Sequence, residues 1–104
     1  MANIMETLKY AKENLEQHGL PGTFKAEDKD FMAAISVLRF EATRIMRANG
    51  TIEKYSGDDA QSYFRKKYSR ENYPDKAEYP FEMLTRMAAE DLFQMIEDHF
   101  TAQD

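Results

Sequence analysis

Residues 31–50 read FMAAISVLRFEATRIMRANG and carry the clearest helical pattern in the chain. Thr23 before this stretch is a suitable N-cap, and Asn49-Gly50 is a typical helix end. The pattern therefore predicts a long central helix over about 24–49. At 100° per residue its apolar side chains share one face: Phe31, Ala34, Ile35, Leu38, Ala42, Ile45 and Met46.

Glycine and proline clusters divide the rest of the chain into three further helical stretches, at about 2–18, 58–70 and 80–101. Ser56 or Asp58 is the expected N-cap of the 58–70 helix. Pro80 suits the first position of the last helix. That last helix has apolar side chains over nearly half its circumference, so we expect it to touch at least two others.

The fold class predicted from these elements is all-α, an irregular four-helix bundle without a sheet, in a single domain over 1–104. No stretch alternates apolar and polar residues for long enough to make a strand, and the fragment 51–55 is too short to pair alone. Both Tyr-Pro steps, at 73–74 and 79–80, predict extended or turning backbone before the last helix.

The composition excludes several classes of protein. The chain has no cysteine, which rules out disulfides and thiolate metal sites. No apolar run approaches the roughly 18 residues that a membrane span requires. The first 20 residues include Glu6, Glu13 and Glu16 and lack the apolar centre of a signal peptide. We therefore expect a soluble cytoplasmic protein without a membrane partner.

Catalytic chemistry is poorly supplied. The two histidines, His18 and His99, stand near opposite ends of the chain. Glu97 and Asp98 are adjacent and point about 100° apart on a helix, so they cannot converge on one ion. No glycine-rich phosphate loop or nucleophile motif is present. The sequence predicts that the protein is not an enzyme and has no cofactor and no metal site.

Phe40 is the residue that points most directly to a partner. It lies opposite the apolar face of the central helix, with Ala33 and Val37 beside it and Arg44 one turn later. Leaving this ring in water costs on the order of 2 kcal/mol relative to burial, so we expect something to cover it. We expect the cover to come from the 58–70 helix or the Tyr-Pro connection. A two-fold copy of the central helix, giving a homodimer, and a different protein are the alternatives.

The excess negative charge lies at the end of the chain. Residues 77–104 contain one cation against seven acidic residues, whereas the whole chain has a net charge of −5. One interpretation is a solvated face that keeps the protein soluble. The other is an acidic surface that meets a basic partner through the outer arc of the last helix: Glu90, Asp91, Glu97 and Asp98.

A basic and aromatic segment, Tyr63–Tyr73, forms the opposite pole. Cations that neutralise phosphates and aromatic rings that stack on bases are the two elements of single-strand binding. The same residues also fit a buried aromatic stripe with cationic edges. The candidate nucleic-acid contacts are Arg65, Lys66, Lys67 and Arg70.

These features together favour a non-catalytic helical protein that binds another protein, as a regulator, adaptor or inhibitor, for example of a nucleic-acid-processing complex. A nucleic-acid-binding protein that uses Tyr63–Tyr73 is the alternative. A third hypothesis is a small-molecule pocket lined by Tyr63, Tyr68 and His99. The predicted partner-binding residues are Val37, Phe40, Arg44, Glu90, Asp91, Glu97 and Asp98.

Overall fold

The structure, a computed structural model, describes residues 3–18 and 29–102. Over these residues it contains four helices and no strand, so the predicted all-α four-helix fold is confirmed. The helices are α1 (Ile4–His18), α2 (Lys29–Asn49), α3 (Ala60–Lys67) and α4 (Phe81–Thr101). The expected start of the first helix at residue 2, and that of the central helix at 24 with its Thr23 cap, lie outside the described residues.

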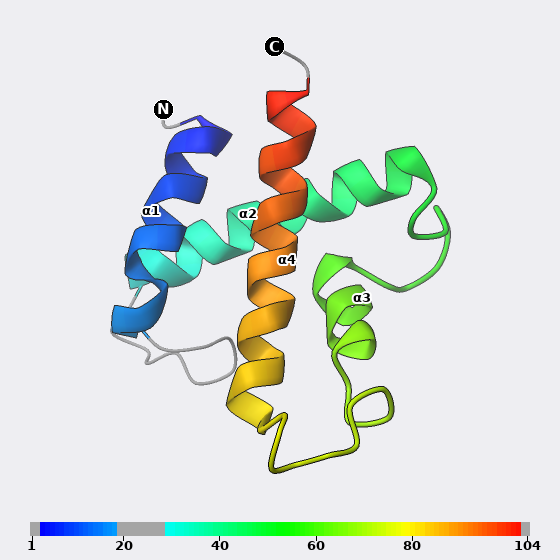
Figure 1. The fold of residues 1–104 in the computed structure, drawn as a ribbon. Coiled ribbons are helices and arrows are strands. Elements are labelled where there is room, and N and C mark those ends of the chain that lie inside the picture. Colours follow the sequence, from blue (N-terminus) through cyan, green and yellow to red (C-terminus); the bar gives the residue numbers. More distant parts are fainter. Residues whose placement is uncertain (1–2, 19–28, 103–104) are drawn as a thin grey trace.

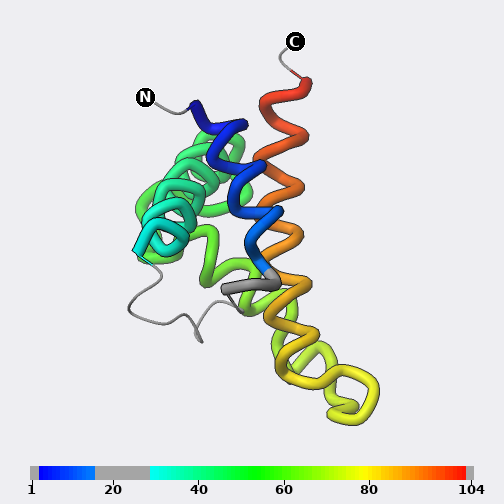
Figure 2. The backbone as a smooth tube through the Cα atoms, turned by 90° about the vertical axis from the view of Figure 1, so that its left-hand side faces the viewer, coloured from blue at the N-terminus to red at the C-terminus, as the bar shows by residue number. Residues whose placement is uncertain are grey.

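Helices α2 and α4 cross at the centre of the molecule, and α1 and α3 lie on either side of α4 (Figure 1). Turned by 90°, the molecule shows α1 running close beside α4 (Figure 2). α4 contacts all three other helices, which confirms the expectation drawn from its wide apolar arc. α2 also contacts all three, whereas α1 and α3 do not touch each other.

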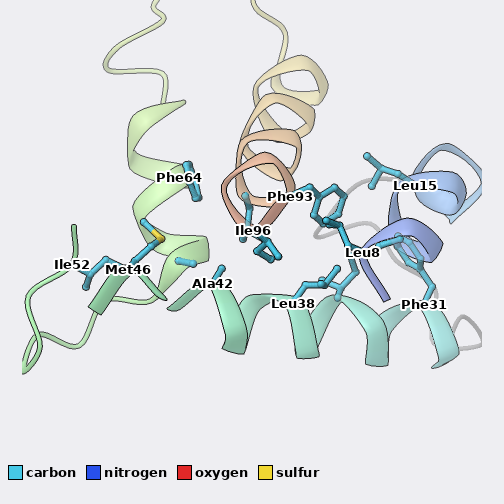
Figure 3. Close-up of a cluster of buried hydrophobic side chains, with 14 residues drawn as sticks. Leu8, Leu15, Phe31, Leu38, Ala42, Met46, Ile52, Phe64, Phe93 and Ile96 are labelled. Carbon is cyan, nitrogen blue, oxygen red and sulfur yellow. The ribbon is translucent and has the colours of Figure 1, made fainter. Parts of the chain in front are cut away.

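The core forms where the four helices meet (Figure 3). Every apolar side chain predicted for the inner face of α2 is buried. Leu8 and Leu15 of α1 meet Phe31 and Leu38 of α2 at one end of this core. The other end contains Met46, Ile52, Phe64 and Ile96.

The boundaries of α3 differ from the prediction. The helix spans Ala60–Lys67 instead of about 58–70, and its N-cap is Asp59 instead of Ser56 or Asp58. Asp59 Oδ1 accepts from the Ser62 N–H at 2.8 Å, and Ser62 Oγ accepts from the Asp59 N–H at 3.0 Å. This reciprocal pair satisfies two backbone donors at once, and it requires a polar residue three positions after the cap. At the start of α4, Pro80 is the N-cap in extended conformation, one residue before the position expected.

Candidate partner-binding surfaces

The outer face of α2 is open to solvent. The Phe40 side chain is 73% exposed and the Val37 side chain is 46% exposed, with Ala33 and Arg44 exposed beside them. We call these four residues the Phe40 surface. The expectation that α3 or the Tyr-Pro connection covers Phe40 is wrong.

The position at which α3 attaches to α2 explains this exposure. Thr43 Oγ1 accepts from the Ala60 N–H at 2.9 Å, and Arg39 Nη2 lies 3.4 Å from Asp59 Oδ2. Thr43 and Arg39 lie about 60° and 100° around α2 from Phe40. From that side α3 packs toward α4, so it leaves the outer face of α2 uncovered.

The charge at the edge of the Phe40 surface is paired within α2. The Arg44 guanidinium forms an ion pair with Glu41 three residues earlier. Its hydrogen bond to Glu41, together with the charge of that carboxylate, raises the pKa of Arg44. The surface therefore consists of an aromatic side chain with small apolar neighbours, and the charge of Arg44 at its edge is neutralised by Glu41.

The four acidic residues predicted as one contact face of α4 have different roles. Asp91 accepts a hydrogen bond from the Tyr68 hydroxyl, and Lys67 Nζ lies 3.5 Å from its Oδ2. Glu97 forms an ion pair with Lys12 of α1. These two carboxylates therefore connect α4 to its neighbouring helices.

The remaining two, Glu90 and Asp98, are exposed. The Asp98 carboxylate accepts from the Gln94 amide one turn earlier at 2.8 Å, which is a contact within α4. Within the part of the chain that the structure describes, neither carboxylate pairs with a cation. Only these two are left to meet a basic partner.

The predicted basic pole is also partly used inside the molecule. Arg70 Nη1 donates to the carbonyl oxygens of Tyr73 and Tyr79, at 2.9 and 2.8 Å. Lys66 Nζ lies 3.9 Å from Asp58, and Lys67 is the partner of Asp91. Arg70 therefore holds the connection between α3 and α4.

The aromatic side chains of this segment contact one another. The Tyr68 and Tyr73 rings stack with their centroids 5.7 Å apart, and Tyr73 meets Tyr79 edge-on at 4.8 Å. These ring faces are therefore engaged within the connection. Nucleic-acid binding through Tyr63–Tyr73 stays an alternative prediction, supported chiefly by the exposed side chains of Arg65 and Lys66.

The structure also contains a groove that sequence reasoning missed. It has a volume of about 470 Å³ and lies between α3 and the first half of α4, with α2 at its base. Of the three residues predicted to line one pocket, Tyr68 lines this groove, and Tyr63 lines a separate depression between α3 and the loop before it. Tyr63 packs edge-on against Phe64, and His99 meets Phe100 in the same way at the far end of α4. The wide apolar arc of α4 is the sequence feature from which this groove could have been predicted.

We find no group of three or more potential metal ligands among the described residues. None of the helices in that part of the chain combines the length and apolarity that crossing a bilayer requires. Comparison with known protein families, characterised proteins and solved structures finds no match to this chain.

Proposed function

We propose that this chain is a non-catalytic protein-interaction module, a regulator, adaptor or inhibitor that acts by occupying a surface of another protein in the cytoplasm. The observation that carries the proposal is the exposed Phe40 side chain. It projects from the middle of a 21-residue helix whose opposite face is buried in the core. An aromatic anchor on a rigid helix loses little conformational freedom when it enters a pocket, and such anchors dominate many interfaces.

The shape of the Phe40 surface favours a different protein over a second copy of this chain. A two-fold interface requires a surface that complements itself. Here, a projecting ring would face another projecting ring. Val37 and Phe40 supply the only large apolar side chains exposed on this surface, whereas a stable interface buries roughly 800 Å² per partner. A concave pocket on a larger partner provides the missing area, and Glu90 and Asp98 are available for a basic region of that partner.

The test compares capture by the immobilised wild-type protein, Phe40→Asp and Tyr55→Asp, from nuclease-treated native extract. Tyr55 is the matched control because its side chain is 93% exposed in the loop before α3. We expect a protein retained by wild type and Tyr55→Asp and lost with Phe40→Asp. The purified partner should then bind Phe40→Asp roughly 30-fold more weakly, the effect of an anchor that contributes about 2 kcal/mol.

Three outcomes would contradict the proposal. If all three proteins captured the same partner equally, Phe40 would not contribute to the interface. Light scattering that shows a wild-type dimer and a folded Phe40→Asp monomer would assign the surface to a second copy. Binding of single-stranded nucleic acid that falls steeply with salt, and is lost on charge reversal of Lys66 and Lys67, would favour the nucleic-acid alternative.

A further inference from the structure

The groove between α3 and α4 is long, apolar and rimmed by cations. Its α4 wall runs from Phe81 to Phe93, about 18 Å at 1.5 Å per residue. Alanines in the middle of that wall leave the space open, and Ile35 of α2 lines the base. The other lining residues of the groove include Arg39, Arg65 and Arg70, and the two alanines are Ala88 and Ala89.

The charge of this lining is opposite to that of the chain. Among the described residues that line the groove, three are arginines and none is acidic, although the protein has 19 acidic residues against 14 lysines and arginines. Arg39 lies at one end, beside the start of α3, and Arg70 lies at the other, bonded to the Tyr79 carbonyl before α4. Arg65 projects from α3 between them. The positive charge therefore extends along the whole groove.

Little of this charge is neutralised inside the protein. Arg70 donates to carbonyl oxygens, which carry no net charge. Arg39 has one carboxylate partner, Asp59, at 3.4 Å, and none of the described residues accepts from its buried Nε. No described residue pairs with the exposed Arg65 side chain. The arginines of the rim can therefore bind carboxylate partners beyond those that the described residues supply.

We propose that this groove binds an acidic amphipathic helix of a partner protein. Such a helix places apolar side chains in a groove at positions i, i+3 or i+4, and i+7, and presents charged side chains to the rim. Its carboxylates can accept paired hydrogen bonds from the planar arginine groups. A ligand with one anionic head would need a cation at only one end. The Phe81 side chain, 70% exposed at the mouth, adds apolar surface that a helix would also cover.

This site is separate from the Phe40 surface. Ile35 and Arg39, the α2 residues of the groove, lie about 140° and 100° around the helix from Phe40. The two proposals can therefore be tested independently. Phe40→Asp is a control variant whose groove is unchanged.

The test uses a fluorescently labelled, designed amphipathic helix of about 18 residues, with leucines at i, i+4 and i+7 and glutamates beside them. The matched peptide has every glutamate replaced by glutamine. Fluorescence anisotropy should show saturable binding of the acidic peptide and at least roughly tenfold weaker binding of its neutral counterpart. Increasing salt should weaken the binding of the acidic peptide.

The protein variants localise the binding. Arg65→Glu should weaken the binding of the acidic peptide by at least about tenfold. Ala88→Leu should weaken it to the same extent because the leucine fills the groove. Lys9→Glu makes the same charge reversal on α1, which does not touch α3, and should change the affinity by less than about twofold. Circular dichroism checks that each variant keeps its helix content. Because Arg65 is exposed, its substitution should leave the fold unchanged even where Ala88→Leu does not.

Several results would overturn the proposal. They include absence of saturable binding and equal affinity of the protein for the two peptides. An equal loss of affinity for the acidic peptide in Arg65→Glu and Lys9→Glu would also overturn it. A dimer that Arg65→Glu converts to a monomer would assign the groove to a second copy. Tighter binding of anionic lipid vesicles or a single-stranded oligonucleotide, displacing the peptide and lost with Arg65→Glu, would assign it to those ligands.

Discussion

Among the individual side chains described, the Tyr68 hydroxyl has the pKa that is shifted furthest from its ordinary value. It donates to the Asp91 carboxylate and so joins the C-terminal end of α3 to the middle of α4. This hydrogen bond, with smaller contributions from burial and from the Asp91 charge, raises the pKa of Tyr68 to about 12. The protonated tyrosine is therefore favoured by the folded state.

This shift predicts a loss of stability in alkali. Between pH 10, the ordinary pKa of tyrosine, and about 12, the folded state keeps a proton that the unfolded state has released. The contribution of Tyr68 is therefore complete below pH 10 and declines as the pH rises to about 12. Urea unfolding at about pH 9 and about pH 11 should show a smaller decline in Tyr68→Phe and Asp91→Asn than in wild type.

Tyr55→Phe is the control for this experiment, because it removes a tyrosine that is almost fully exposed. It should keep the full alkaline decline of the wild-type protein. The pKa of Tyr79 is also raised, chiefly by the charge of Glu78, so part of the decline remains in every variant. A decline in Tyr68→Phe as large as in wild type would refute the assignment to Tyr68.

At the element scale, α3 depends on contacts from outside itself. It has eight residues, fewer than the roughly 12–15 at which an isolated helix becomes even marginally stable in water. Its first turn is held by the Asp59–Ser62 capping pair and by Thr43 of α2. Burial raises the pKa of Asp59, but the Ser62 N–H and the Arg39 charge outweigh it and lower the pKa overall.

Thr43→Val should detach the start of α3 from α2. The valine cannot accept from the Ala60 N–H, which would be left buried without its partner, at a cost of about 1–3 kcal/mol. Thr85→Val is the matched control, since both hydroxyls donate to the carbonyl four residues earlier, at 2.8 and 2.9 Å. Urea unfolding should show a loss below about 0.5 kcal/mol for that control. Equal losses in the two variants would contradict this role of Thr43.

The sequence correctly predicted that a helix forms in this region. Its predicted first and last residues, about 58 and 70, were wrong. Asp58 and Asp59 are equally good capping residue types. Asp59 is the N-cap because Ser62 stands three positions later and because Thr43 accepts a hydrogen bond from the next backbone N–H, that of Ala60. The second of these conditions involves a residue of another helix, so local pattern alone could not reveal it.

At the scale of the whole molecule, α2 and α4 connect every helix to one core. Leu38 is fully buried there, so Leu38→Ala should lower the free energy of unfolding by about 2–5 kcal/mol. The adjacent Val37→Ala, on the exposed face, should cost less than about 0.5 kcal/mol. Circular dichroism and tyrosine fluorescence should follow one coincident transition in urea. Separate transitions would contradict the prediction of a single domain over 1–104.

The local sequence pattern predicted the four helices of the described residues, the inner face of α2 and the position of Phe40 opposite that face. All of these follow from the 3.6-residue period and from residues that end helices, which act over a few neighbouring positions. It also located the acidic end of the chain and the basic segment.

How those features meet depends on the packing of the four helices against one another. Asp91 is bound to a residue 23 positions away and Glu97 to one 85 positions away, so neither remains a free surface charge. Phe40 stays exposed because α3 docks on another side of α2, and a groove bordered by Ala88 and Ala89 lies between α3 and α4. The rotation and separation of helices are set by the packing of the shared core, which the period of a single helix does not encode.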